Sequence, residues 1–113
     1  MKKENCLKKN DDFQLVFKRG KSVANRQFVL YFLKKEEQST IRIGISVSKK
    51  LGNAVTRNRI KRYIREAMRE IIPQLHQSYD LVIIARKPTV EMGLDEIKKS
   101  LLHVLKLSRI KKR

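Results

Sequence analysis

Apolar residues along this chain recur first with a helical and then with a strand-like spacing. The first helix is predicted to begin at a cap residue, Asn10, and to stop at Gly20. Two acidic residues, Asp11 and Asp12, would lie in its electropositive first turn. Its single narrow apolar face, at spacings of three and four residues, would consist of Phe13, Val16 and Phe17.

Two later segments alternate in the manner of β-strands. The two faces of residues 28–33 (FVLYFL) would present Phe28, Leu30 and Phe32 on one side and Val29, Tyr31 and Leu33 on the other. In residues 41–48 (IRIGISVS) the core-facing positions would be Ile41, Ile43, Ile45 and Val47. Because only the polar segment 34–40 joins the two segments, we expect them to pair as antiparallel neighbours.

The second half of the chain contains two helical segments and a third strand. One helix is predicted to begin at Asn53, with Thr56 as the alternative cap, and to end before Pro73. The continuous apolar run at 80–85 (DLVIIA) is typical of a strand buried on both faces. Gly93 would cap the last helix, whose apolar face would consist of Ile97, Leu101, Val104 and Leu105.

The predicted order, α-β-β-α-β-α, is that of a small α+β domain with helices packed on a mixed sheet of three or four strands. A length of 113 residues fits a single domain over residues 1–113. We expect residues 1–6 and the basic tail 109–113 to be flexible. The general rule for parallel strands joined through a helix predicts a right-handed crossover.

The charge of the chain indicates its class of partner. Lysine and arginine number 28 against 11 acidic residues, which gives a formal net charge of +17. A charge of this size predicts a polyanionic partner. Nucleic acid is favoured over a membrane because the sequence has neither an apolar run long enough to span a membrane nor a signal peptide. A lone cysteine, Cys6, can form no internal disulfide, so we expect no disulfide partner and a cytoplasmic location.

The cations are concentrated in the helix after Asn53. At about 100° of rotation per residue, the apolar positions of this helix gather on one side. A second arc around the helix axis carries basic residues and no acidic residue. That arc consists of Lys61, Arg65, Asn58, Arg69 and Arg62. A solvated structural face usually mixes both signs, so this arc favours a phosphate-binding surface over an ordinary basic face. Arg57 lies near the first turn, and Arg59 lies outside the arc, where loop or tail carboxylates could pair with it.

The first helix and the sheet offer a second candidate surface. If that helix packs at the sheet edge, Phe13 and Phe17 could line a groove together with Val29 and Tyr31. Aromatic rings beside hydroxyl groups are typical of platforms that stack single-stranded bases. Ordinary core packing of the phenylalanines is the alternative interpretation.

No catalytic constellation is evident. His76 and His103 lie far apart in the sequence and match no metal-binding spacing. A free-standing protein nuclease would need a carboxylate cluster for metal or a histidine acid–base pair. We therefore predict no catalytic residue in the protein and assign no metal ligand.

Residues 46–69 (SVSKKLGNAVTRNRIKRYIREAMR) resemble the signature of the bacterial ribonuclease P protein subunits, including the Arg-Asn-Arg segment at 57–59. Residues 7–33 and 80–88 also look like this family, so the resemblance spans nearly the whole chain. It implies the order α-β-β-β-α-β-α, with an extra short strand within 18–27 and a left-handed crossover. It also implies a protein that binds a catalytic RNA and with it removes the 5′ leader of precursor tRNA in a Mg2+-dependent hydrolysis, the RNA holding the catalytic metals.

The resemblance also implies roles for individual residues. The residues expected to contact the catalytic RNA are Arg57, Asn58, Arg59, Lys61, Arg62, Arg65 and Arg69. The residues expected to bind the single-stranded leader are Phe13, Phe17, Val29, Tyr31, Ser46, Lys49, Lys50 and Asn53.

The sequence thus favours the accessory protein of a ribonucleoprotein endonuclease. The alternatives are a small basic protein of ribosomal type, which would bind RNA without altering any cleavage, and a free-standing protein nuclease.

Unneutralised charge makes the fold sensitive to anions. Sulfate or phosphate should raise the melting temperature above that in chloride of equal ionic strength, because an anion that binds only the folded state stabilises it by mass action. Thermal melts followed by circular dichroism check this. Equal melting temperatures in sulfate and chloride would contradict it.

Overall fold

The computed structural model describes residues 1–112, so Arg113 of the expected flexible tail lies outside the described residues. A helix and two strands open the chain: α1 (Asn10–Arg19), β1 (Lys21–Ala24) and β2 (Phe28–Lys34). They are followed by β3 (Arg42–Ser46), α2 (Ala54–Ile71), β4 (Tyr79–Ala85) and α3 (Leu94–Ser108). Short 3-10 turns η1 (Lys3–Asn5), η2 (Lys49–Leu51), η3 (Ile72–Gln74) and η4 (Lys87–Glu91) lie between them. The order confirms the one implied by the resemblance, and β1 is the extra strand.

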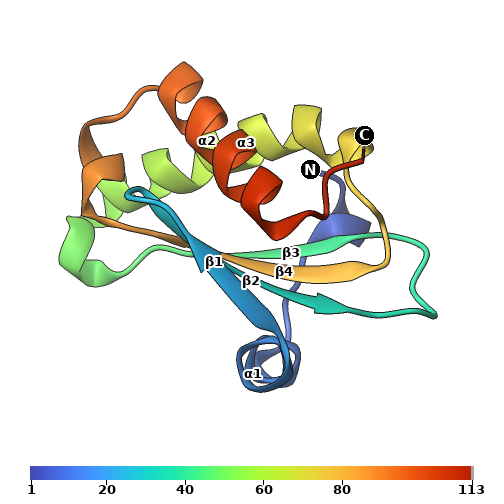
Figure 1. Ribbon diagram of the computed structural model, residues 1–113. Coiled ribbons are helices and arrows are strands. Elements are labelled where there is room, and N and C mark those ends of the chain that lie inside the picture. The colour runs from blue at the N-terminus through green and yellow to red at the C-terminus, as the bar shows by residue number, and fades with distance from the viewer. Residues whose placement is uncertain (113) are drawn as a thin grey trace.

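The four strands form one mixed sheet in the order β1-β2-β4-β3 (Figure 1). β4 pairs antiparallel with β2 and parallel with β3. The expectation that β2 and β3 pair with each other was therefore wrong. The polar connection at 35–41 lacks the glycine or asparagine residues of a tight hairpin. The most apolar strand, β4, takes the central place instead and gains a neighbour on each side.

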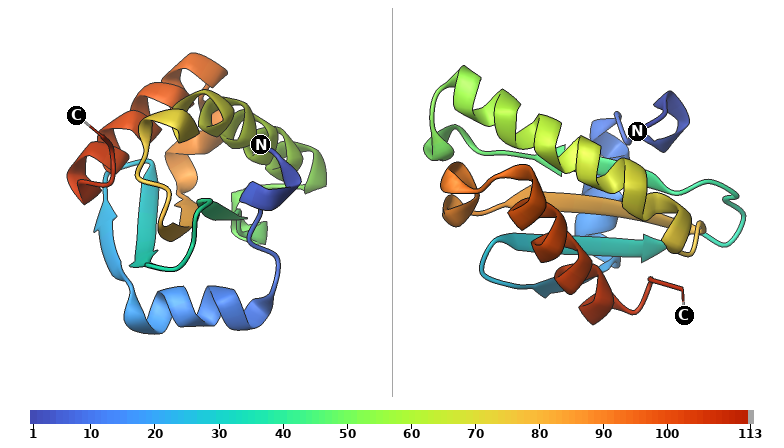
Figure 2. Two further views of the ribbon diagram at one scale, coloured as in Figure 1. Left: turned by 90° about the vertical axis from the view of Figure 1, so that its right-hand side faces the viewer. Right: turned by 90° about the horizontal axis from the view of Figure 1, so that it is seen from above.

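The β3–α2–β4 connection is left-handed, against the general rule and as the resemblance implies. Seen from above, β3 and β4 run in the same direction, and α2 runs back in the opposite direction on the near side of the sheet, over the β3 edge (Figure 2). α2 lies over β3 at one edge of the sheet, whereas α3 covers β1 and β2 at the other edge.

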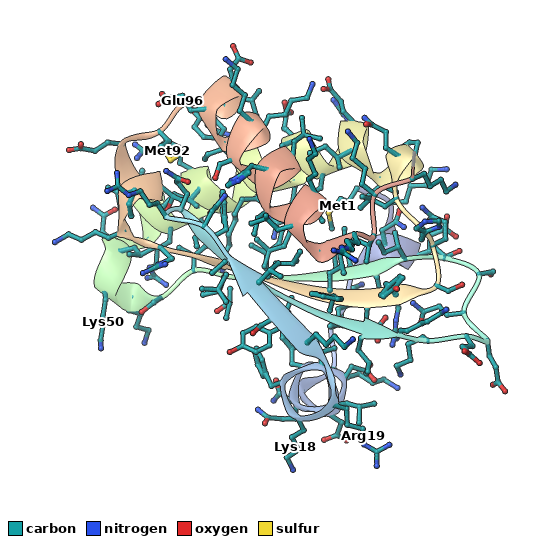
Figure 3. The ribbon with its side chains drawn as sticks, in the orientation of Figure 1. Met1, Lys18, Arg19, Lys50, Met92 and Glu96 are labelled. Atoms are coloured by element: carbon teal, nitrogen blue, oxygen red, sulfur yellow. The ribbon has the colours of Figure 1, made fainter. Side chains whose placement is uncertain are left out.

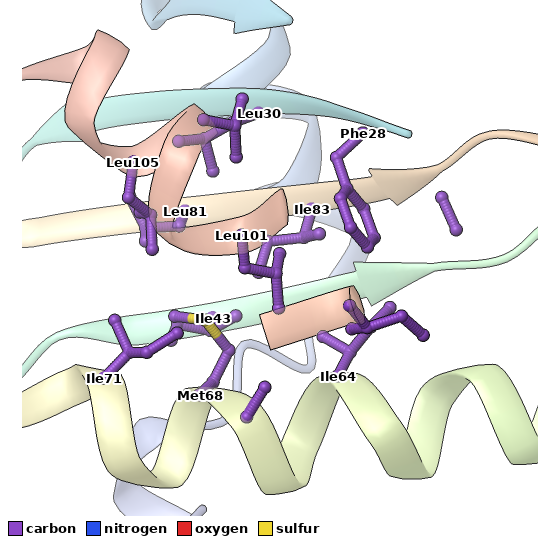
Figure 4. Close-up of a cluster of buried hydrophobic side chains, with 14 of the residues drawn as sticks. Phe28, Leu30, Ile43, Ile64, Met68, Ile71, Leu81, Ile83, Leu101 and Leu105 are labelled. Atoms are coloured by element: carbon purple, nitrogen blue, oxygen red, sulfur yellow. The ribbon is translucent and has the colours of Figure 1, made fainter. Parts of the chain in front are cut away.

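The main core lies between these two helices and the sheet (Figure 4). All four predicted core positions of α3 and most of those of β3 are buried in it, and only Ile45 is partly exposed. A smaller cluster on the opposite face joins α1 and the sheet through Leu7, Val16 and Val82. β4 is thus buried on both faces, as its continuous apolar run predicts.

The helix ends agree only in part with their predicted caps. The Asn53 side chain accepts a hydrogen bond from the Thr56 amide at 2.9 Å, and Gly93 caps α3. Asn10, however, is the first residue of α1 and not its cap; Lys9 holds that position without a side-chain cap bond. The two aspartates of the first turn remain to stabilise that end.

Both chain ends make defined contacts. The Leu7 amide donates to the Ile43 carbonyl at 3.0 Å, so the N-terminal segment lies along the edge of β3. Ile110, inside the tail expected to be flexible, is buried in the main core. The Lys112 amide donates to the Gln74 carbonyl at 2.7 Å. An apolar residue within a basic tail is enough to attach that tail to the core.

A buried carboxylate anchors the sheet at the start of β4. Asp80 is fully buried and accepts hydrogen bonds from Arg42 at 2.9 and 2.6 Å and from Gln38 at 2.9 Å. The Asp80 hydrogen bonds raise the pKa of Arg42 above its ordinary value. Arg42 also reaches Asp12 of α1 at 3.5 Å, so one guanidinium links β3, β4 and α1.

Removing this guanidinium should destabilise the protein. In Arg42→Met the Asp80 carboxylate keeps only Gln38 and the more distant Lys35, and we expect a loss of about 2–4 kcal/mol in the free energy of unfolding. Urea denaturation measures it. Lys98→Met, which breaks the exposed Lys98–Glu70 pair, is the control and should change little. Equal losses in both variants would show that burial of Asp80 is not what matters.

Candidate RNA interface

α2 presents its polar residues on the side away from the main core. Ile60, Ile64, Ala67, Met68 and Ile71 are buried beneath it. Asn58, Arg62, Arg65 and Arg69 are exposed, whereas Arg57, Arg59 and Lys61 are half-buried. The cations predicted to share one surface therefore do so, with Arg59 at its margin.

Three of these arginines make local contacts. Arg57 Nε donates to the Gly52 carbonyl at 3.2 Å, and the Arg62 guanidinium lies 5.4 Å from the centre of the Tyr63 ring. Arg59 donates to the backbone carbonyl of Val90 in η4. The sequence left open whether a carboxylate would pair with Arg59. Its partner in the structure is a peptide oxygen, which does not neutralise the charge of the guanidinium.

Within residues 1–112 the predicted contact residues of α2 take part in no ion pair. Glu70 of the same helix pairs instead with Lys98 of α3, and this hydrogen bond lowers the pKa of Glu70. The Glu70 carboxylate therefore points toward α3. The exposed side of α2 therefore keeps an excess of positive charge that no ion pair within residues 1–112 neutralises.

The two phenylalanines of α1 play different parts. Phe13 lies against Gly44 of β3, where a Cβ atom would overlap its ring. Phe17 is 36% exposed and meets Tyr31 edge-on, with the ring centres 4.9 Å apart. Phe13 mainly positions α1 on the sheet, whereas Phe17 and Tyr31 offer aromatic surface to a ligand.

The sheet face beside α1 forms a partly exposed strip. The register places Val29 of β2 opposite Ile84 of β4, and Ile84 opposite Ser46 of β3, so these side chains share one row. All three are half-buried. Tyr31, two residues after Val29 on β2, faces the same side of the sheet in the next row, opposite Val82. We call the surface of Val29, Tyr31, Ser46 and Ile84 the leader strip. Ile84 was missed because its place in the row depends on β4 lying between β2 and β3.

The two candidate surfaces meet at the edge of β3. A cleft of about 240 Å3 is lined by Phe13 of α1, Ile45 of β3, and Lys61 and Arg65 of α2. The N-terminal segment, which lies along the edge of β3, also lines this cleft, with Met1, Cys6, Leu7 and Lys8.

The remaining predicted residues lie at the far end of β3. Lys49 and Lys50 are exposed in η2, and Asn53 follows as the cap of α2. Lys50 shares a cleft of about 380 Å3 with Lys87, which the sequence analysis did not select. This end of the sheet carries cations but no aromatic ring among the residues that line the cleft.

Neither histidine belongs to these surfaces. His76 follows η3 and His103 lies on α3, where its Nδ1 atom is 3.3 Å from the Asn25 side-chain nitrogen. Among residues 1–112 no three of histidine, cysteine, aspartate and glutamate come together where they could hold a metal ion. None of the helices in that range is long and apolar enough to cross a membrane.

Known proteins resemble this chain over nearly all its length. The family model for ribonuclease P matches residues 1–108. A ribonuclease P protein component from Listeria innocua is 62% identical, covering 99% of this chain and 94% of the relative. One from Bacillus cereus (strain Q1) is 60% identical, covering 99% and 97%.

Solved structures agree with this relationship. The ribonuclease P protein of Staphylococcus aureus superposes with a TM-score of 0.89 at 48% identity, covering 96% of this chain and 98% of that one. The protein from Thermotoga maritima gives 0.81 at 35% identity, covering 90% and 96%.

The chain therefore belongs to the ribonuclease P protein family. Its role is that of a protein component in the processing of the tRNA 5′ leader together with an RNA subunit. The family resemblance seen in the sequence is confirmed.

Contact between Phe13 and Gly44 should fix the position of α1. Gly44→Ala forces the ring aside, and we expect a loss of about 1–3 kcal/mol in the free energy of unfolding, as for other overpacked sites. Urea denaturation measures it. Gly93→Ser is the control, because a Cβ there has no neighbour closer than 3.9 Å. An unchanged Gly44→Ala stability would show that α1 is not fixed by this contact.

Proposed function

We propose that this protein binds the catalytic RNA through the exposed side of α2 and the single-stranded 5′ leader of precursor tRNA through the leader strip. Hydrolysis itself is carried by the RNA subunit in the cytoplasm. The protein raises affinity for precursor over mature tRNA, because only the precursor has a leader to bind.

The observation that carries this proposal is the unpaired charge on α2. Several arginines and one lysine on a rigid helix form no ion pair within residues 1–112. Cations held in this way bind phosphates and release the counterions condensed on RNA, which is the main source of affinity for a nucleic acid. Arginine also donates two parallel hydrogen bonds to one phosphate.

The leader strip differs in chemistry from α2. It offers the half-buried Tyr31 ring, with the exposed Phe17 ring of α1 against it, beside apolar Val29 and the Ser46 hydroxyl. Unpaired bases stack on such rings with little regard to sequence. The cleft that Phe13 shares with Lys61 and Arg65 supports a close approach of the catalytic RNA to the leader at this edge of the sheet.

We assign the Mg2+ ions that the reaction requires mainly to the RNA. Mg2+ prefers oxygen ligands, including phosphates, whereas the exposed side of α2 carries cations that would repel it. The part of the protein is to hold the leader in place while metal-bound RNA groups act.

Cleavage of precursor tRNA by protein alone, RNA alone and both together tests this function. We expect no cleavage by the protein, slow cleavage by the RNA, and faster cleavage by the pair at low substrate concentration. Activity of the protein alone would establish a protein nuclease. No effect of the protein on the RNA would favour a merely structural RNA-binding protein.

Loss of one phosphate contact on α2 should weaken binding to the catalytic RNA. For Lys61→Ala, the slope of log affinity against log salt should fall by about 0.7–0.9, the value of one contact. Filter binding across a salt series measures it. Lys99→Ala, which removes an exposed charge from α3, should leave the slope unchanged. Equal slopes for wild type and Lys61→Ala would remove Lys61 from the interface.

Loss of the Tyr31 ring should affect the leader only. Tyr31→Ala should weaken binding of precursor tRNA to the assembled enzyme by about 1–3 kcal/mol, the usual value of one stacked base. Binding of mature tRNA, which has no leader, should not change. If both RNAs lose affinity equally, the strip does not bind the leader.

A further inference from the structure

A cleft at the C-terminal end of α2 is built from both ends of the chain. Its volume is about 410 Å3, and the residues that line it include Lys2, Glu4, Arg69, Ile72, Pro73 and Lys112. Figure 2 shows the two chain ends on either side of the end of α2. We call this site the terminal cleft. The roles proposed above use Arg69 but neither of the two lysines.

The terminal cleft carries more positive than negative charge. Lys2, Arg69 and Lys112 are exposed, and so is Glu4, which is the only acidic residue among the described residues that line the cleft. None of these four side chains takes part in an ion pair within residues 1–112. Three cations beside one carboxylate leave an excess of positive charge, which attracts an anionic partner.

Buried contacts hold the N-terminal segment beside α2. The Asn5 side chain is buried and donates to the Ile41 carbonyl at 2.8 Å. The side chain of Met1, labelled in Figure 3, packs against the main core. Lys2 lies between these two attached residues. It therefore belongs to a segment with a defined course and not to a free tail.

The C-terminal segment is held in a similar way. The carbonyl of buried Ile110 accepts a hydrogen bond from the His76 amide at 2.8 Å, and the Lys112 amide donates to the Gln74 carbonyl at 2.7 Å. The segment thus pairs antiparallel with the residues that follow η3. The turn itself is braced by Gln77, whose side-chain nitrogen donates to the carbonyls of Ile72 and Leu75, both at 2.9 Å.

Cations on attached segments bind an anion at a lower entropic cost than cations on flexible tails. A disordered segment loses conformational entropy when it is ordered by its partner, which weakens binding. In this domain the backbones of Lys2 and Lys112 are already placed beside Arg69 before any partner binds. The terminal cleft is in this sense prepared for phosphate groups.

The position of the terminal cleft favours the catalytic RNA over the leader. Met1 lines both this cleft and the one that contains Lys61 and Arg65, so the two clefts adjoin along α2. From Lys61 to Arg69 the helix rises by about 12 Å. The described residues that line the terminal cleft include no aromatic ring on which an unpaired base could stack. Its chemistry is that of backbone binding.

We infer that the terminal cleft binds backbone phosphates of the catalytic RNA through Lys2 and Lys112 together with Arg69. It extends the basic surface of α2 beyond the end of the helix. This inference rests on the proposed function, because the surface that it extends is the one assigned there to the catalytic RNA.

Compensation of the α2 dipole is the alternative explanation for these cations. The last turn of a helix carries a partial negative charge, and nearby cations stabilise it. That effect would appear in the stability of the free protein. Binding of the RNA would appear in the affinity for the RNA and in its dependence on salt.

Removal of both lysines should weaken binding to the catalytic RNA. For Lys2→Gln/Lys112→Gln, the slope of log affinity against log salt should fall by about 1.4–1.8, the value of two phosphate contacts. Filter binding of the full chain to the catalytic RNA across a salt series measures it. Lys99→Gln/Lys106→Gln removes the same charge from exposed positions of α3 and should keep the wild-type slope.

Two further measurements make the result specific. The melting temperature of the double variant without RNA should stay within a few degrees of the wild type, since both side chains are exposed. The ratio of affinities of the assembled enzyme for precursor and mature tRNA should not change. If that ratio falls, the cleft binds the leader and the inference is wrong.

The remaining outcomes separate this inference from the proposed function. A wild-type slope in the double variant, with or without a lower melting temperature, would show that the terminal cleft does not bind the RNA. An equal loss in the α3 control would show an effect of net charge alone and would also overturn the inference. If Lys61→Ala still lowers the slope in these cases, α2 remains the RNA surface and only the terminal cleft fails. If Lys61→Ala has no effect either, the proposed function fails as well.

Discussion

An excess of positive charge that the domain does not neutralise is the constraint on which this structure depends. With 28 basic residues against 11 acidic ones, most cations have no acidic partner. Compaction of such a chain increases self-repulsion. The fold limits this cost by keeping its cations on outer surfaces and by burying apolar residues on both faces of one strand, β4. The cation that reaches inward, Arg42, does so toward the buried carboxylate of Asp80.

Under the proposed function, the separation of charge from aromatic surface lets one small domain treat two kinds of RNA differently. α2 presents cations on a rigid helix, which suits the backbone of a folded RNA. The leader strip presents rings on a sheet, which suits unpaired bases. The left-handed crossover makes this division possible, because it places α2 over β3 and leaves the opposite sheet face to α1. The small cleft with Phe13, Lys61 and Arg65 is where the two surfaces meet.

Local patterns in the sequence predicted the elements well, and long-range pairing poorly. The alternation at residues 28–33 and 41–48 identified both strands and their buried faces, since burial follows directly from the side-chain period. It could not show that β4 lies between β2 and β3. The paired residues of β3 and β4, such as Arg42 and Asp80, are 38 positions apart in the sequence. The cations of α2 were found because helical geometry alone places them together. Ile84 was not found, since its place in the row depends on which strands are neighbours.

The central position of β4 also affects how the chain can fold. β2 can pair with β1 early, but β3, whose only neighbouring strand is β4, cannot join the sheet until residues 79–85 have left the ribosome. The nascent chain must therefore carry α2, with its exposed cations, before there is a complete sheet to support it. Contacts between such distant residues are slow to form. If α2 binds the RNA as proposed, the RNA can engage this helix while the domain is still assembling, so that protein synthesis and assembly of the ribonucleoprotein overlap in time.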